Sequence, residues 1–242
     1  MSIAERPGTQ QIVYPESDGQ PMADNTLQYE WITTIKGGLD GVFRDDPDVF
    51  IAGDLLWYPV EGEPTIRCAP DVLVAFGRPK GYRGSYLQWK EANVAPQVVF
   101  EVLSPGNRFY EMLRKFRFYE QYGVEEYYLF DPDRNELDGW RRAGDKLDEI
   151  PEMNGWISPR LGIRFELGAS GLCIYGPNGQ QFLTYEELTR DRDEATRQRD
   201  EVTRERDEVT RERDEVTRER DAVRARADQL AARLRELGVE PE

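Results

Sequence analysis

Histidine is absent from this chain of 242 residues, and cysteine occurs only twice. Without histidine, the chain has no Ser-His or Cys-His nucleophile pair and no histidine-ligated zinc. Cys68 and Cys173 lack metal-ligand spacing, and two cysteines give no disulfide framework. The sequence therefore excludes histidine-dependent hydrolases, zinc sites with histidine ligands and disulfide-rich scaffolds.

The sequence also lacks a long apolar run and an excess of basic residues. No run approaches the ~20 residues of a membrane span, and MSIAERPGTQ has no apolar region of a secretory signal. We therefore expect a cytoplasmic protein with no membrane partner. The 32 Lys and Arg residues against 47 Asp and Glu give a formal net charge of −15. Nucleic-acid binding would thus depend on a local basic patch or on bound cations.

Composition changes along the chain predict three parts. Residues 1–23 carry several prolines with little periodicity, which predicts an extended N-terminal arm. Residues 24–184 hold nearly all of the aromatic side chains and have enough core material for one domain. Residues 185–239 differ in character, because the unit RDEVTRE recurs there every seven residues. This last part is expected to form a long charged helix or coiled coil.

One helix is expected near the start of the central part. Asp24 or Asn25 is a suitable N-cap, and the apolar residues of TLQYEWITTIKGGL follow helical spacing. Gly37 and Gly38 predict the end of this helix. Farther along, residues 77–95 are rich in glycine and charge, which predicts a surface loop with at most one helical turn.

Short apolar runs predict the strands of a sheet. The segments concerned are VFIAGDLLWYPV, broken near Gly53-Asp54, then PDVLVAF, QVVFEVL and EEYYLFD. An amphipathic helix is expected from Phe109 to Tyr122, stopped by Gly123, between the last two of these runs. The order strand–strand–helix–strand predicts an α/β fold with a mixed sheet flanked by helices.

The heptad region presents one consistent apolar position. It is occupied by Ala195, Val202, Val209, Val216, Val223, Leu230 and Leu237. The second seam position is arginine from Arg199 to Arg220 and becomes apolar only at Ala227 and Leu234. A full coiled coil requires both positions to be apolar. Two interpretations stay open: a single helix stabilised by charge pairs, and a dimeric or higher coiled coil nucleated near its C-terminal end.

Charged residues stand at the ends of, or inside, the apolar runs. Asp71 precedes VLVAF, Glu101 lies in QVVFEVL, Lys115 follows on the predicted helix, and Asp131 ends EEYYLFD. A buried charge is costly unless it has a partner. Two carboxylates and a lysine suit Mg²⁺ or Mn²⁺ and a hydrolytic water. Structural alternatives are a turn cap for Asp71 and Asp131, and an ordinary surface lysine for Lys115.

The segments APDVLVAF, PQVVFEVLSPGNR and EMLRKFRFYEQYGVEEYYLFDP resemble the Uma-type restriction endonucleases, a branch of the PD-(D/E)XK nuclease superfamily. The resemblance covers most of residues 25–165 and implies a restriction-endonuclease-like fold. It implies that Asp71 and Glu101 are catalytic metal ligands, with the backbone carbonyl of Val102 as a further ligand. The superfamily's usual lysine position is Leu103 here, and the resemblance implies that Lys115 takes over as the catalytic lysine.

The resemblance implies a metal-dependent DNA endonuclease that hydrolyses phosphodiester bonds with Mg²⁺ or Mn²⁺. The C-terminal helix is expected to serve oligomerisation or partner binding, with a homo-oligomer formed through that helix or the core domain. An alternative is a catalytically inactive nuclease-fold scaffold, which Leu103 and the acidic charge favour. A nuclease acting on RNA or branched DNA is a third hypothesis.

Overall fold

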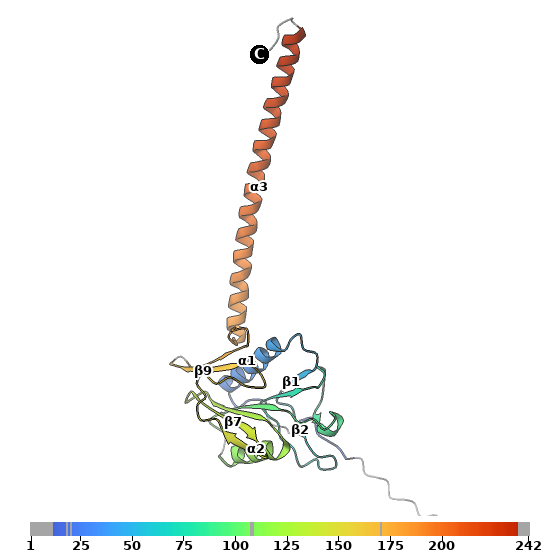
Figure 1. Cartoon of the computed structure of the whole chain (residues 1–242), viewed down its shortest axis with the longest axis vertical. Helices are drawn as coiled ribbons and strands as arrows, with labels where there is room; N and C mark the ends of the chain where they lie inside the picture. The colour runs from blue at the N-terminus through green and yellow to red at the C-terminus, as the bar shows by residue number, and fades with distance from the viewer. Residues whose placement is uncertain (1–11, 18, 20, 107–108, 170, 237–242) are drawn as a thin grey trace, which may run out of the picture. The chain divides into compact units, whose positions relative to one another are not determined.

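A six-stranded mixed sheet lies in the first of two compact units of this computed structural model. The first unit comprises Met1–Tyr185 and the second comprises Glu186–Glu242 (Figure 1). The structure describes residues 12–17, 19, 21–106, 109–169 and 171–236. Residues 1–11 of the expected arm and residues 237–239 of the expected helix lie outside the described residues.

The predicted apolar runs form four strands of the sheet, β1, β3, β5 and β6, and β7 and β8 complete the order β1-β3-β5-β6-β7-β8. Their bounds are β1 Val49–Gly53, β3 Val72–Phe76, β5 Val98–Val102, β6 Glu126–Asp131, β7 Glu136–Ala143 and β8 Lys146–Glu149. β5 and β6 run parallel, whereas the other neighbours are antiparallel. Every residue of β5 is buried. A strand covered on both faces explains why this run is apolar apart from Glu101.

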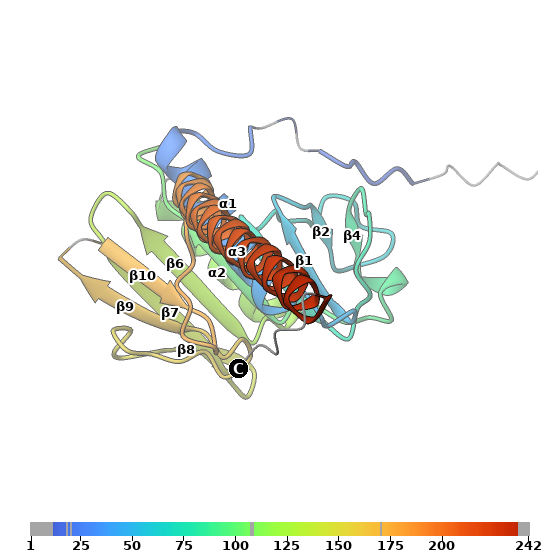
Figure 2. The same ribbon diagram turned by 90° about the horizontal axis from the view of Figure 1, so that it is seen from above.

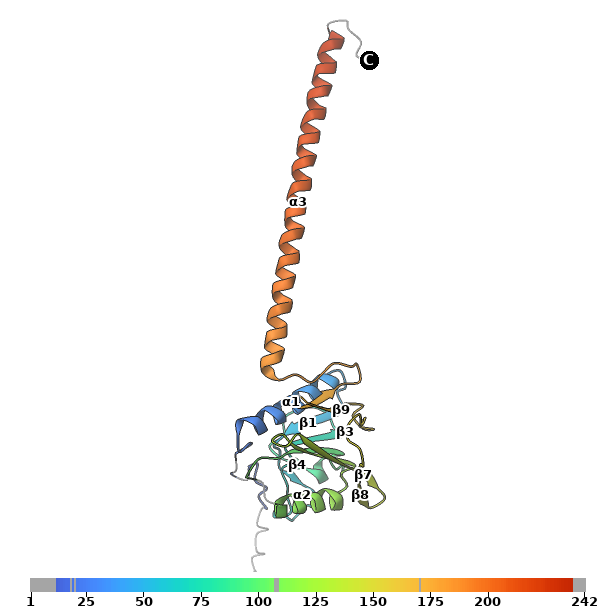
Figure 3. The same ribbon diagram turned by 90° about the vertical axis from the view of Figure 1, so that its left-hand side faces the viewer.

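Helices α1 (Thr26–Val42) and α2 (Phe109–Tyr122) lie on opposite faces of the sheet (Figure 3). Because side chains alternate along a strand, each face receives every second strand residue. The core on the α1 face includes Ile32, Ile35, Leu39, Val72, Val74, Val98 and Phe100. The core on the α2 face includes Leu73, Val99, Tyr119, Val124 and Tyr127. The predicted mixed sheet flanked by helices is confirmed.

The start of α1 agrees with the sequence, but its predicted end is wrong. Asn25 caps the helix, because its side chain accepts a hydrogen bond from the backbone N–H of Gln28. The helix then continues through Gly37 and Gly38 to Val42. A Cβ atom on Gly38 would lie 2.1 Å from Cδ2 of Phe182. Glycine is therefore needed here for close approach of an aromatic ring, and it does not terminate the helix.

Alanine substitutions at these two glycines are expected to have opposite effects. Gly38→Ala forces the ring of Phe182 to move, and such overpacking costs about 1–3 kcal/mol of unfolding free energy. Gly37→Ala meets no atom within 4 Å and should stabilise the helix by up to about 1 kcal/mol. Urea unfolding of both variants measures the difference. Equal stabilisation by both would show that Phe182 does not contact α1 in this way.

Two small sheets complete the first unit and lie on opposite sides of it in Figure 2. One is the hairpin of β9 (Arg164–Gly168) and β10 (Gly171–Tyr175), which adds Phe165, Leu172 and Ile174 to the core of the α1 face. The other is the parallel pair of β2 (Trp57–Tyr58) and β4 (Tyr86–Leu87). β4 lies in the segment expected to be a surface loop, and a single 3₁₀ turn, Gln88–Lys90, follows it. The loop prediction is therefore only partly right, because Tyr86 is fully buried.

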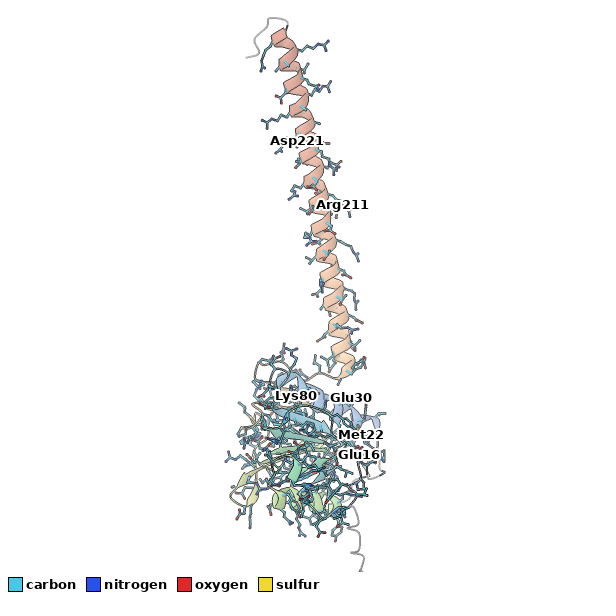
Figure 4. All side chains as sticks on the ribbon, turned by 90° about the vertical axis from the view of Figure 1, so that its right-hand side faces the viewer. Glu16, Met22, Glu30, Lys80, Arg211 and Asp221 are labelled. Atoms are coloured by element: carbon cyan, nitrogen blue, oxygen red, sulfur yellow. The ribbon has the colours of Figure 1, made fainter. Side chains whose placement is uncertain are left out.

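The second unit is described as one long helix, α3 (Tyr185–Glu236). Figure 4 shows side chains projecting from it on all sides, Arg211 and Asp221 among them. The apolar heptad position forms a stripe along this helix, which we call the valine stripe. Its residues Val202, Val209, Val216, Val223 and Leu230 are between 58% and 70% exposed. Within the described parts of the chain, no helix is long and apolar enough to cross a membrane.

Candidate active site

The register of β3 and β5 brings Asp71 and Glu101 together. Asp71 directly precedes β3, and Val72 pairs with Phe100 in the antiparallel ladder. The same register places Asp71 opposite Glu101, and opposite residues have Cβ atoms about 4.5–5.5 Å apart. Both side chains are buried. Two carboxylates far apart in sequence therefore lie side by side, buried at the end of the ladder between β3 and β5.

Asp71 is held by the backbone around it. Its Oδ2 accepts a hydrogen bond from the N–H of Val102 at 2.7 Å. Its own carbonyl accepts from the N–H of Asp54 at 3.1 Å. Burial and the negative charge of Glu101 raise the pKa of Asp71 well above its usual range. An aspartate in this position therefore keeps its proton to a higher pH than an exposed aspartate does.

Helix α2 supplies both donors to the carboxylate of Glu101. The Nζ of Lys115 donates to Oε2 at 2.7 Å, and the hydroxyl of Tyr119 donates to Oε1. Residues four apart lie on one face of a helix, so Lys115 and Tyr119 reach the same side chain. Lys115 also donates to the carbonyl of Ala69 at 3.3 Å, in the segment that leads to Asp71.

Lys115 is a buried cation in this arrangement. Burial lowers the pKa of its ammonium group, but the negative charge of Glu101, helped by Asp71, outweighs this and raises the pKa above its usual value. The lysine therefore stays protonated at neutral pH. The structure thus brings all three predicted residues, Asp71, Glu101 and Lys115, into one cluster.

Val102 and Leu103 follow Glu101 and have different surroundings. The carbonyl of Val102 accepts a hydrogen bond from Nε2 of Gln28 at 2.8 Å. A carbonyl oxygen has two lone pairs, so this bond leaves one for a further partner. Leu103 lines a separate apolar cavity beside α2 with Phe116 and Trp140. Its side chain offers no charge to the carboxylate cluster.

Gln28 is a residue that the sequence reasoning missed. It is buried, and its Oε1 accepts from the N–H of Asp24 at 2.8 Å while its amide holds the Val102 carbonyl. The signal was present in the helical spacing. Gln28 falls on the same stripe as Ile32, Ile35 and Leu39, where a polar side chain needs a partner.

A cavity of about 760 Å³ opens onto the cluster. Asp71 and Lys115 line it, together with side chains from the N-terminal segment, the loops before β2 and β3, and α2. Two further cations, Arg67 and Arg114, also line it. The cavity therefore combines the Asp71 carboxylate with three basic side chains, and Asp24, Asp54 and Glu111 add further acidic ones.

Three further acidic residues, Asp131, Glu30 and Asp54, have different surroundings. Asp131 caps a turn, since its Oδ1 accepts from the N–H groups of Asp133 and Arg134 at 3.0 and 3.1 Å. Glu30 is exposed on α1 and is not part of the cavity lining (Figure 4). Asp54 lines the cavity from an exposed turn with φ of 47°.

The donor set suits a hard divalent cation. Asp71 and Glu101 are oxygen ligands, and their two negative charges face one lysine, so a cation would offset the charge that raises the pKa of Asp71. No group of three or more His, Cys, Asp or Glu side chains in the described ranges is arranged to hold a metal ion. Two carboxylates with further positions left to water and phosphate oxygens are typical of Mg²⁺.

Comparisons with known proteins give a family and a structural neighbour. The Uma2 family model, described as "Putative restriction endonuclease", matches residues 21–170. The fold is similar to a crystal structure from Anabaena variabilis ATCC 29413, described as "a putative nuclease belonging to DUF820", with 14% sequence identity and a TM-score of 0.42. That similarity covers 56% of this chain and 72% of the other. No curated protein matches the sequence.

Proposed function

Since this chain belongs to the Uma2 family of restriction endonucleases, we propose that it is a metal-dependent nuclease that hydrolyses phosphodiester bonds of DNA. The observation that carries the proposal is the buried pair of Asp71 and Glu101, with Lys115 bonded to Glu101 beside an open cavity. Buried carboxylates are costly as structural elements, so their pairing here favours a catalytic role.

In the proposed mechanism, Asp71 and Glu101 would hold Mg²⁺ or Mn²⁺, with the carbonyl of Val102 as a further ligand. When bound, such a metal polarises the phosphodiester and lowers the pKa of a bound water. Lys115 orients the attacking water and stabilises charge that develops on the phosphate. Arg67 and Arg114 bind phosphate oxygens at the cavity wall.

The net charge of −15 makes local cations important for this activity. A long-range positive field cannot guide DNA to an acidic protein, so binding depends on short-range contacts. Arg67, Arg114 and Lys115 are the basic residues of the cavity, and a bound divalent ion adds to them. Asp24, Asp54, Asp71 and Glu111 also line the cavity, so its basic residues are matched by acidic ones and DNA binding depends on the bound cation.

The helix α3 is proposed to join two copies of the chain. Its valine stripe is exposed on the helix, and burying such a stripe against an identical one is the usual role of a heptad repeat. If Val209 takes the d position, Arg206 takes a and Glu205 takes g of the preceding heptad. A parallel pair sets each arginine at a against the partner's arginine and beside the partner's glutamate, whereas an antiparallel pair sets glutamate against glutamate. The proposed dimer therefore rests on the valine stripe and not on charge pairing.

Cleavage of supercoiled plasmid DNA by the purified full chain tests the proposed function. Nicked and linear products should appear with Mg²⁺ or Mn²⁺ and disappear with a chelator. Single-stranded DNA, branched DNA and RNA should be tested in parallel, and cleavage of RNA alone would replace DNA as the substrate. A chain that cleaves none of these with either metal is better described as an inactive nuclease-fold scaffold.

A further inference from the structure

Tyr119 connects the chain segments that carry both carboxylates. Its hydroxyl donates to Oε1 of Glu101 and lies 3.3 Å from Sγ of Cys68. Burial raises the pKa of the Cys68 thiol to about 11, so this thiol is protonated and donates to the tyrosine oxygen. Cys68 belongs to the short segment that ends at Asp71. A single hydroxyl thus joins the strand of Glu101 to the segment of Asp71.

We propose that Tyr119 is a positioning residue of the metal site, which fixes one oxygen of Glu101 and leaves the other to the metal ion. This inference rests on the proposed function. Lys115 bonds to Oε2 and lines the cavity, so Oε2 is the oxygen on the side from which a cation enters. Tyr119 bonds to Oε1, so this second oxygen stays bonded to the tyrosine when a cation binds Oε2.

A second donor is needed because a glutamate side chain is flexible. The terminal torsion of glutamate is broad, so a carboxylate held by one lysine can rotate in place. Tyr119 is fully buried, and its ring lies against Phe118 and Tyr127, with ring centroids 6.0 and 5.1 Å away. The hydroxyl therefore has a fixed position. Partners that orient a ligating carboxylate typically contribute 10- to 100-fold to metal affinity.

The hydroxyl of Tyr119 is the donor in its bond to Glu101, which is the direction that this role requires. A tyrosine that keeps its proton donates a hydrogen bond to a carboxylate and does not compete with it for a cation. A phenylalanine ring at this position would pack in the core equally well. Removing the hydroxyl alone therefore distinguishes a role in positioning Glu101 from a role in core packing.

The experiment compares Tyr119→Phe with Tyr127→Phe in the full chain. Tyr127 is a matched control, because it is buried in the same aromatic cluster and its hydroxyl has no hydrogen-bond partner among the described residues. Both substitutions remove one buried hydroxyl and keep the ring. Mn²⁺ affinity is measured by titration calorimetry, and circular dichroism verifies that each variant is folded.

Tyr119→Phe is expected to weaken Mn²⁺ binding by about 10- to 100-fold, with Tyr127→Phe within about twofold of the unmodified chain. Cleavage by Tyr119→Phe should need more metal, with its rate largely restored at saturating metal. Unchanged affinity in Tyr119→Phe, or equal losses in both variants, would overturn the positioning role and leave the proposed function intact. Absence of binding by the unmodified chain would instead overturn the proposed function itself.

Discussion

Replacing Glu101 by glutamine is expected to reduce DNA cleavage by at least about 100-fold. Glutamine keeps the shape of the side chain, and its carbonyl oxygen still accepts a hydrogen bond from Lys115 or Tyr119. It removes the negative charge that a divalent cation requires. Asp71→Asn removes the other negative charge of the pair and should have an effect of the same order. Initial rates of plasmid nicking at fixed Mg²⁺ measure both losses.

Glu126→Gln is the matched control for this prediction. Glu126 is also a buried glutamate, but it accepts hydrogen bonds from Tyr128, Ser158 and the N–H of Arg160. It alternates with Tyr127 on β6 and therefore faces the α1 side of the sheet, whereas Glu101 faces α2. Glu126→Gln should lower stability and leave cleavage per folded molecule unchanged. Equal residual cleavage in all the variants would show that the activity arises elsewhere.

Loss of residues 185–242 is expected to convert a dimer into a monomer. The apolar stripe of α3 gains stability only when a second stripe covers it, since each residue of the stripe is largely exposed on a lone helix. Analytical ultracentrifugation of the full and the shortened chains should therefore give masses that differ by more than the deleted segment. Cleavage of both strands in one encounter should also decline, because it benefits from two linked active sites.

A full-length variant separates the stripe from other effects of truncation. Serine at positions 202, 209, 216, 223 and 230 removes the described valine and leucine side chains of the stripe and keeps the length and charge of α3. This variant should sediment as a monomer. A dimer in both altered chains would place the interface in the first unit. A full chain that sediments as a monomer would identify α3 as a single charged helix.

The sheet could be predicted from the sequence because its strands are long enough to show a pattern. VLVAF, VVFEV and EYYLFD are apolar runs, and each forms a strand. The pair of β2 and β4 could not be predicted equally well, because two-residue strands carry no alternation. The end of α1 could not be predicted for another reason. The role of Gly38 depends on Phe182, which lies far along the chain.

The candidate site was predictable in its residues and not in its contacts. Asp71, Glu101 and Lys115 stand out because charge interrupts or follows apolar runs. Their convergence depends on the register between β3 and β5 and on the direction of α2, which no local pattern encodes. Tyr119 fits the core and the site equally well by spacing. Only its bond to Glu101 distinguishes the two roles.

The central claim is that Asp71 and Glu101 together hold one divalent cation. Crystals of the full chain grown or soaked with Mn²⁺ test it most directly, through the anomalous signal of manganese. The account predicts a peak within coordination distance, roughly 2.0–2.4 Å, of carboxylate oxygens of both residues. Lys115 should then no longer bond to Oε2 of Glu101. A peak that contacts neither carboxylate, or no peak at saturating Mn²⁺, would contradict it.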